Sequence, residues 1–468
     1  MGAVEVDDDD LVRAARCGGP MPATVCQEIA KWAERQKTPA ELRAFVKMLP
    51  DVIVSVQATT DALSRRADDL TSDGRSLGDD PELQDWMWHL GAAINMLAFA
   101  AARAVQPGLD APEVVDHVED LTTSVVGLPW RAWSPLSVLA FRSLALIYSK
   151  QDDYERAWGA HEDAKQAVER HRSEAVTEVV GAMLDDVYQQ LWLSESGTGC
   201  RELEWYLREG VAEHHDDPAA ELLALIASVD PIDRAIASAR QAWDITQRID
   251  AAGRLGRKSE YRLLHRGSYR QPGVMGARAC LLKMVLCEVM CQARHPPPDD
   301  RPSWAEQAQN AFWQFFDFYR LAEDPRDALA TSDDDYVPIL DEHQRSLVQH
   351  LLMFAVLFPD QPFEPRRQVP ASLNVTVLDA AALEALSEEL LNWKVGGEPR
   401  PAGANTIGQS ISPMFNAAVD KVRSSVRYVG PTYREWRLRY PTLDRREERT
   451  SSKSADRNEV TLRSLPAR

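Results

Sequence analysis

Three cysteines and one histidine lie at helical spacing in residues 275–295, and thiolates and an imidazole are residue types that bind zinc. All four would project from one face of a helix; they are Cys280, Cys287, Cys291 and His295. Structural zinc sites favour CxxC pairs, and the chain has none. Cysteine also packs as a small buried apolar residue. We therefore interpret this face as hydrophobic core and expect no metal.

Two basic segments that contain aromatic rings could bind nucleic acid. Residues 251–273 carry six basic side chains against Glu260 alone, and residues 421–446 combine arginines with tyrosine and tryptophan. Arginine binds phosphate and aromatic rings stack on bases in single-strand binders. The alternative is that these segments form ion pairs with the acidic surface of the same protein. The residues that we assign to a nucleic-acid surface are Arg257, Arg262, Arg266, Arg434, Trp436 and Arg437.

Catalytic signatures are missing from the sequence. It contains no HExxH, no GxSxG and no GxGxxG that follows a strand. We therefore favour a protein that is not an enzyme and expect no cofactor, while an unrecognised catalytic site stays open.

One loose motif keeps a catalytic alternative open. Arg345 and His350 are spaced as Arg-x4-His, which resembles the motif of the HEPN class of helical ribonucleases. That resemblance implies a ribonuclease in which His350 acts as acid or base and Arg345 stabilises phosphate charge. A chain this rich in arginine contains such a pair by chance, and Arg156 with His161 forms a second one.

Residues 138–171 carry large and small side chains at offsets that resemble one tetratricopeptide repeat. The matching positions are Phe141, Leu144, Ala145, Tyr148, Ala157 and Ala164. His161 departs from the pattern, because a bulky apolar residue is usual there. Glu169 departs as well, where a helix-ending proline is common. The resemblance implies two antiparallel helices joined by a tight turn, which Asp152 or Asp153 could cap.

A stack of such hairpins exposes a concave groove that suits a peptide or a helix. We assign partner binding in this groove to Tyr148, His161 and Ala164. The leading hypothesis is therefore a protein–protein interaction scaffold. The alternative is a nucleic-acid-binding protein or a HEPN-like ribonuclease.

Composition narrows the class of protein and its compartment. The chain has 468 residues, 44% of them hydrophobic, and a net charge of −19, which argues against wholesale binding to nucleic acid or anionic membrane. The apolar run at 351–358 is far shorter than the roughly 20 residues of a membrane span. The acidic N-terminus is unlike a secretory signal. We expect a cytoplasmic protein, and its many arginines and alanines suggest a GC-rich bacterial genome.

Apolar residues recur at intervals of three or four residues along most of the chain. This spacing predicts an all-α fold of stacked helical hairpins or an irregular helical bundle. Thr38 and Glu41 form a predicted capping box, and Pro50 is expected to end that helix. Residues 194–199 are expected to form a flexible loop. One short strand is predicted near residues 373–378.

The predicted organisation has five regions and one further boundary at the proline run 295–302. The regions are an N-terminal helical region at 1–80, tetratricopeptide-like hairpins at 81–250, a basic loop at 251–275, a C-terminal helical region at 276–440 and a disordered tail at 441–468.

Overall fold

The computed structural model describes residues 13–75, 80–106, 113–127, 135–172, 178–207, 223–227, 230–253, 270–292 and 295–322. Of these residues 86% are helical and none belongs to a strand, which confirms the predicted all-α class. Within the same ranges no helix is long and apolar enough to cross a membrane. The strand predicted near residues 373–378 lies outside the described residues.

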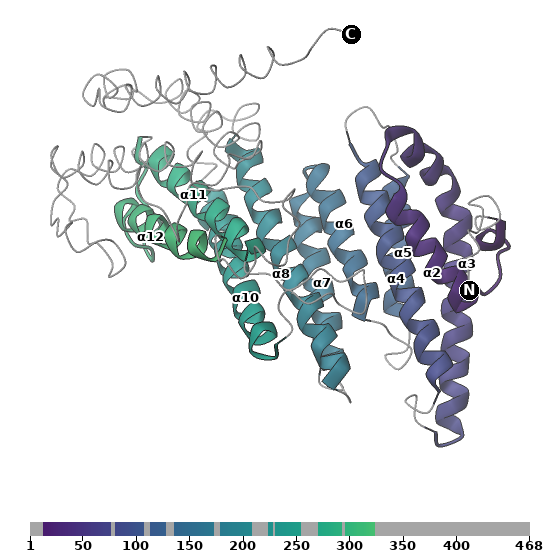
Figure 1. The fold of residues 1–468 in the computed structure, drawn as a ribbon. Coiled ribbons are helices and arrows are strands. Elements are labelled where there is room, and N and C mark those ends of the chain that lie inside the picture. The colour runs from purple at the N-terminus through teal and green to yellow at the C-terminus, as the bar shows by residue number, and fades with distance from the viewer. Residues whose placement is uncertain are drawn as a thin grey trace, which may run out of the picture.

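The main elements of the fold in the described residues are α-helices and one short 3-10 helix (Figure 1). Their bounds are α2 (Ala23–Arg35), α3 (Pro39–Ser72), α4 (Pro81–Ala104), α5 (Val114–Gly127), η3 (Pro135–Val138), α6 (Leu139–Lys150), α7 (Tyr154–Arg172), α8 (Glu178–Trp205), α10 (Pro231–Ala251), α11 (Arg270–Gln292) and α12 (Trp304–Ala322).

The helices lie side by side in a row that begins with α3 and α2 and ends with α11 and α12 (Figure 1). Alternate helices touch along this row: α2 packs on α4, α4 on α6, α6 on α8, and α8 on α11. Sequential helices such as α6 and α7, or α11 and α12, also pack together. The molecule is therefore a stack in which helices mainly contact their neighbours along the row, as in helical repeat proteins.

A continuous hydrophobic core runs from α2 to α8 and reaches the side chains of Ile245 and Ile249 on α10. Helix α4 lies at the centre of the first half, because α2, α3, α5 and α6 all pack against it. Its alanines, such as Ala93, Ala98 and Ala101, are completely buried. These small side chains allow several helices to pack closely against α4.

Helices α6 and α7 form the hairpin expected at residues 138–171. Ala145, Ala157 and Ala164 have no exposed surface, so small side chains do stand where the two helices and their neighbours meet. The carboxylate of Asp153 accepts a hydrogen bond from the backbone N–H of Arg156 at 3.2 Å, which caps α7. The assignment of this hairpin to the tetratricopeptide family stays a prediction.

The capping box predicted at the start of α3 is present. The hydroxyl of Thr38 accepts a hydrogen bond from the backbone N–H of Glu41, and the Glu41 carboxylate accepts one from the Thr38 N–H at 2.8 Å. These two bonds satisfy N–H groups that the first helical turn leaves unpaired.

The prediction that Pro50 ends this helix was wrong, because α3 continues through it to Ser72. A proline inside a helix removes one backbone hydrogen bond and costs about 3 kcal/mol. The buried side chains of Leu49, Val52 and Ile53 pack into the core on both sides of it. Burial of each such side chain is worth about 1.5 to 3 kcal/mol, so packing outweighs the local cost.

The prediction of a loop at residues 194–199 was also wrong, because α8 is helical from Glu178 to Trp205. Gly199 serves a close helix crossing there. A Cβ atom at this position would collide with the carbonyl oxygen of Pro231, the first residue of α10. The glycine is therefore explained by packing between α8 and α10 and not by a turn.

Residues 295–302, the predicted boundary, join α11 to α12, and these two helices pack against each other. The five predicted regions stay predictions.

We expect Gly199→Ala to lower the free energy of unfolding by about 1 to 3 kcal/mol, because the added methyl group overpacks the crossing. Gly159→Ala is the matched control, since no atom lies within 4 Å of a Cβ at this exposed site on α7. There, alanine should stabilise the helix by up to about 1 kcal/mol. Urea denaturation measures both, and equal effects at the two positions would contradict the close crossing.

Candidate functional site

Most of the residues predicted to bind or to catalyse lie outside the described residues. The set comprises Arg257, Arg262, Arg266, Arg345, His350, Arg434, Trp436 and Arg437. Both the nucleic-acid surface and the HEPN-like pair therefore stay predictions.

The three residues assigned to partner binding on the repeat are described, and all of them are buried in helix packing. Tyr148 donates a hydrogen bond from its hydroxyl to the Glu119 carboxylate at 2.5 Å, and the Arg156 guanidinium lies 4.3 Å from the centre of its ring. Ala164 is completely buried, and His161 is 1% exposed. In this conformation a partner would reach these side chains only if the helices separated, so their binding role stays a prediction.

The cysteine face of α11 lies in the interior. Cys280 and Cys287 are completely buried, and burial raises the pKa of the Cys287 thiol to about 12. Burial likewise raises the pKa of Cys291 to about 11. Such thiols are protonated at neutral pH and behave as apolar core side chains. Across the described ranges, no group of three or more His, Cys, Asp or Glu side chains is arranged to hold a metal ion.

The most unusual feature of the interior is a row of buried polar residues along α8, which the sequence analysis missed. Its members are Gln189, Gln190, Glu195, Ser196, Thr198, Glu202 and Glu204. Charged and polar side chains are rarely buried unless they are paired. We call this row the α8 polar array. Its partners come from the helices α6, α7, α10 and α11.

Glu195 forms the central ion pairs of the array. Only 2% of its side chain is exposed, and its two oxygens bind Lys165 of α7 at 3.0 Å and Arg234 of α10 at 2.7 Å. The Arg234 guanidinium also lies 4.0 Å from the centre of the Trp158 ring. One carboxylate therefore joins three helices.

Two further carboxylates extend the array along α8. Glu202 accepts a hydrogen bond from the indole N–H of Trp158 at 2.7 Å, and burial raises the pKa of the Glu202 carboxyl. Glu204 binds Arg278 of α11, whose Nε donates at 2.9 Å. Each pair connects α8 to a different helix, which fixes how these helices are aligned along their axes.

His161 of α7 meets the array through Thr198. Its Nε2 lies 3.0 Å from the threonine hydroxyl. Burial, together with the positive charges of Arg201, Lys165 and Arg234, lowers the pKa of His161 to about 3. A general acid or base works best with a pKa near the operating pH and with access to a substrate. Buried and neutral, His161 meets neither condition in this conformation.

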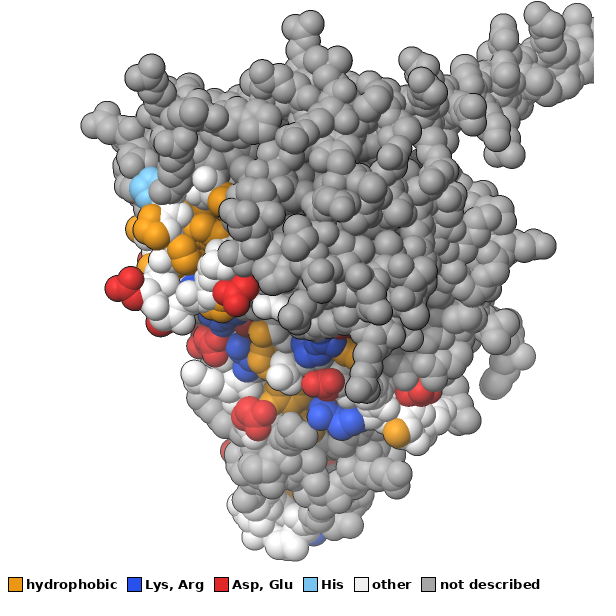
Figure 2. Space-filling model, turned by 90° about the vertical axis from the view of Figure 1, so that its left-hand side faces the viewer, with side chains coloured by type: hydrophobic (Ala, Val, Ile, Leu, Met, Phe, Trp, Pro, Cys, Tyr) orange, Lys and Arg blue, Asp and Glu red, His pale blue; other side chains and the backbone are white. Residues whose placement is uncertain are grey.

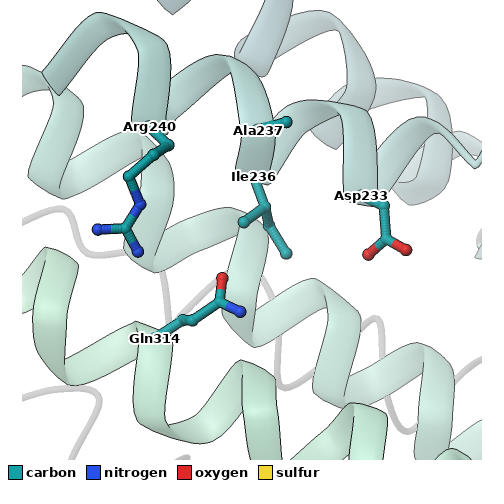
Figure 3. Close-up of a pocket in the computed structure, with 5 residues that line it drawn as sticks. All are labelled: Asp233, Ile236, Ala237, Arg240 and Gln314. Carbon is teal, nitrogen blue, oxygen red and sulfur yellow. The ribbon is translucent and has the colours of Figure 1, made fainter. Parts of the chain in front are cut away.

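A pocket of about 360 Å³ opens between α10 and α12 (Figure 3). It is lined by Asp233, Ile236, Ala237, Arg240 and Gln314. The first four residues stand along one side of α10, and Gln314 extends toward them from α12 (Figure 3). The pocket therefore has an apolar centre with a carboxylate at one end and a guanidinium at the other.

The two charges of the pocket differ in how they are compensated. Asp233 binds Lys283 at 3.0 Å and Arg301 at 3.2 Å. Arg240 has no ion pair or hydrogen bond with any described residue, and its guanidinium lies 4.6 Å from the ring centre of Trp243 and 4.7 Å from that of Phe318. The pocket thus presents one cation whose charge no described carboxylate neutralises. No motif in the sequence marks it.

Neither a protein-family model, nor a curated protein, nor a solved structure matches this chain.

His161 should make the protein less stable in acid. The native state keeps His161 neutral down to about pH 3, whereas the unfolded chain binds a proton below the ordinary pKa of 6.5. Between these values the unfolded state holds more protons, so stability falls as the pH falls, by up to about 1.4 kcal/mol per pH unit.

His161→Leu removes this proton uptake, so its free energy of unfolding should fall less steeply than that of the wild type between pH 6 and pH 4. Denaturant titrations at several pH values measure the slope. The same replacement at the partly exposed His117 of α5 serves as a control for the loss of any histidine. Identical slopes for wild type and His161→Leu would contradict a buried neutral imidazole.

Proposed function

We propose that this protein is a non-catalytic scaffold or regulatory adaptor that binds a protein partner on its stack of helices. The observation that supports this proposal is the pocket between α10 and α12. It combines apolar side chains, Ile236 and Ala237, with Arg240, whose charge is paired with no carboxylate among the described residues. Sites that bind ligands or peptides are concave, mostly apolar and contain a few placed polar groups.

The charge pattern around this end of the molecule favours a protein partner. Figure 2 views the end where α11 and α12 lie, and the described side chains visible there mix hydrophobic, basic and acidic types. A surface that binds the nucleic-acid backbone needs clustered positive charge. A mixed surface with aromatic and arginine residues is more typical of protein interfaces.

The buried titratable groups give no support to an enzymatic role. His161 and Glu202 are enclosed by packed helices, and neither lines the pocket. A reacting group must meet its substrate, which these side chains cannot do in this conformation. Perturbed pKa values also arise in structural ion-pair networks, and the α8 polar array is such a network.

We propose a cytoplasmic location for this scaffold. By analogy with helical repeat proteins, we propose that it serves as an accessory of a bacterial signalling or defence system. The alternative of nucleic-acid binding rests on the basic segments 251–273 and 421–446 alone.

The proposal predicts that the full-length protein, used as bait in its native cell extract, retains a specific protein after nuclease treatment. The interaction should survive moderate salt, because a pocket contact that is partly apolar depends less on counterion release than phosphate binding does. Mass spectrometry of the retained material, with an unrelated acidic protein as bait control, checks this.

Recovery of nucleic acid alone would contradict the scaffold. In that case affinity for single-stranded RNA should fall steeply with rising salt, and alanine at Arg257, Arg262 and Arg266 should flatten the slope by about one unit per lost phosphate contact.

A further inference from the structure

We propose that the pocket between α10 and α12 binds a glutamate or aspartate side chain of the partner protein, and that Arg240 is the residue that recognises its carboxylate. This inference rests on the proposed scaffold function and specifies the chemistry of the segment that the scaffold would take.

Among the described residues, no side chain occupies the hydrogen-bond donors of Arg240. The rings of Trp243 and Phe318 lie within 5 Å of the guanidinium carbon, one on α10 and the other on α12. Ring contacts of this kind stabilise the cation but accept none of its in-plane hydrogen bonds. A guanidinium held in this way is pre-organised for a planar, bidentate acceptor such as a carboxylate.

The other two arginines of α10 lie beside carboxylates of the same chain. Arg234 binds the buried carboxylate of Glu195 at 2.7 Å, and Arg248 lies 3.5 Å from Asp185. Arg240 is the exception on this helix, since it has no carboxylate among the described residues, although it is partly buried in a pocket. A carboxylate of a partner protein would supply the hydrogen-bond acceptor that Arg240 lacks among the described residues.

The pocket favours a carboxylate over a phosphate. Asp233 stands seven residues before Arg240, so it faces the same pocket two helical turns away. The chain as a whole carries a net charge of −19. Because Asp233 is compensated by Lys283 and Arg301, the preference rests on the overall negative charge, which repels a doubly charged phosphate more strongly than a singly charged carboxylate.

The apolar centre of the pocket suits the rest of an acidic peptide segment. Ile236 and Ala237 lie between the two charges, where they can contact methylene groups and a neighbouring apolar side chain (Figure 3). The amide of Gln314 faces them from α12 and can hydrogen-bond the bound segment. A volume of about 360 Å³ accommodates a few side chains and not a folded domain.

Acetylated and amidated peptide pools test the inference on the full-length protein. The pools share random apolar and polar flanks, and the central residue is glutamate, glutamine or phosphoserine. Fluorescence polarisation should show binding of glutamate peptides and at least about tenfold weaker binding of glutamine peptides, because a charge-assisted bidentate pair is lost. Equal binding of the two pools, preference for phosphoserine, or no binding by any pool would overturn the inference.

Three variants test whether the glutamate peptide binds at Arg240. Arg240→Gln should weaken binding of the selected glutamate peptide about tenfold or more, whereas Arg248→Gln, on the same helix and half exposed, should not change it. Ala237→Glu adds a carboxylate one turn before Arg240 at an exposed position, so it should pair with Arg240 and block the peptide without loss of helix stability. Circular dichroism confirms that each variant is folded.

Retention of a partner from cell extract by the wild type and the variants distinguishes failure of the pocket inference from failure of the scaffold proposal. If the wild-type protein retains a partner from extract and both Arg240→Gln and Ala237→Glu retain it equally, the pocket inference is wrong and the scaffold stands. If no protein partner is retained by the wild type, the scaffold proposal fails.

Discussion

The second half of the structure depends on the compensation of one buried carboxylate. Glu195 has lost nearly all contact with water, and an unpaired buried charge costs several kcal/mol. Lys165 and Arg234 supply the opposite charges from the helices on either side. These ion pairs form only when α7, α8 and α10 are aligned correctly along their axes. The α8 polar array therefore selects one packing arrangement among those that apolar contacts alone would permit.

Two different kinds of interface consequently hold the stack together. In the first half, small alanines of α4 allow close approach of several helices, and the stabilisation comes from apolar burial. In the second half, hydrogen bonds and ion pairs of α8 cross the interfaces, and Gly199 brings the helix against the start of α10. The buried ion pairs of the second half specify the register of α7, α8 and α10. Helix α10, which is held in this way, also lines the pocket.

The pocket benefits from that rigidity. Asp230 caps α10 and is bound by Lys283 and Arg301, so the N-terminal end of α10 is fixed to α11 and to the connection that follows it. Arg234 fixes the next turn to α8. Arg240, two turns further on, is therefore carried by a helix that is already immobilised. A binding group on a rigid element loses little conformational entropy when a ligand arrives.

The sequence by itself determined the fold class of this protein and the start of α3. The 3.6-residue periodicity predicted an all-α fold, and the Thr38 capping box was correct because its partners are three residues apart. Tertiary structure decided the rest. Helix α3 passes through Pro50, and α8 passes through Gly199, because packing with distant segments outweighs local preference. Likewise, Arg234 is paired with Glu195, whereas Arg240 contacts two aromatic rings and no carboxylate among the described residues. Which helices lie beside α10 decides this difference, and a linear sequence does not show that arrangement.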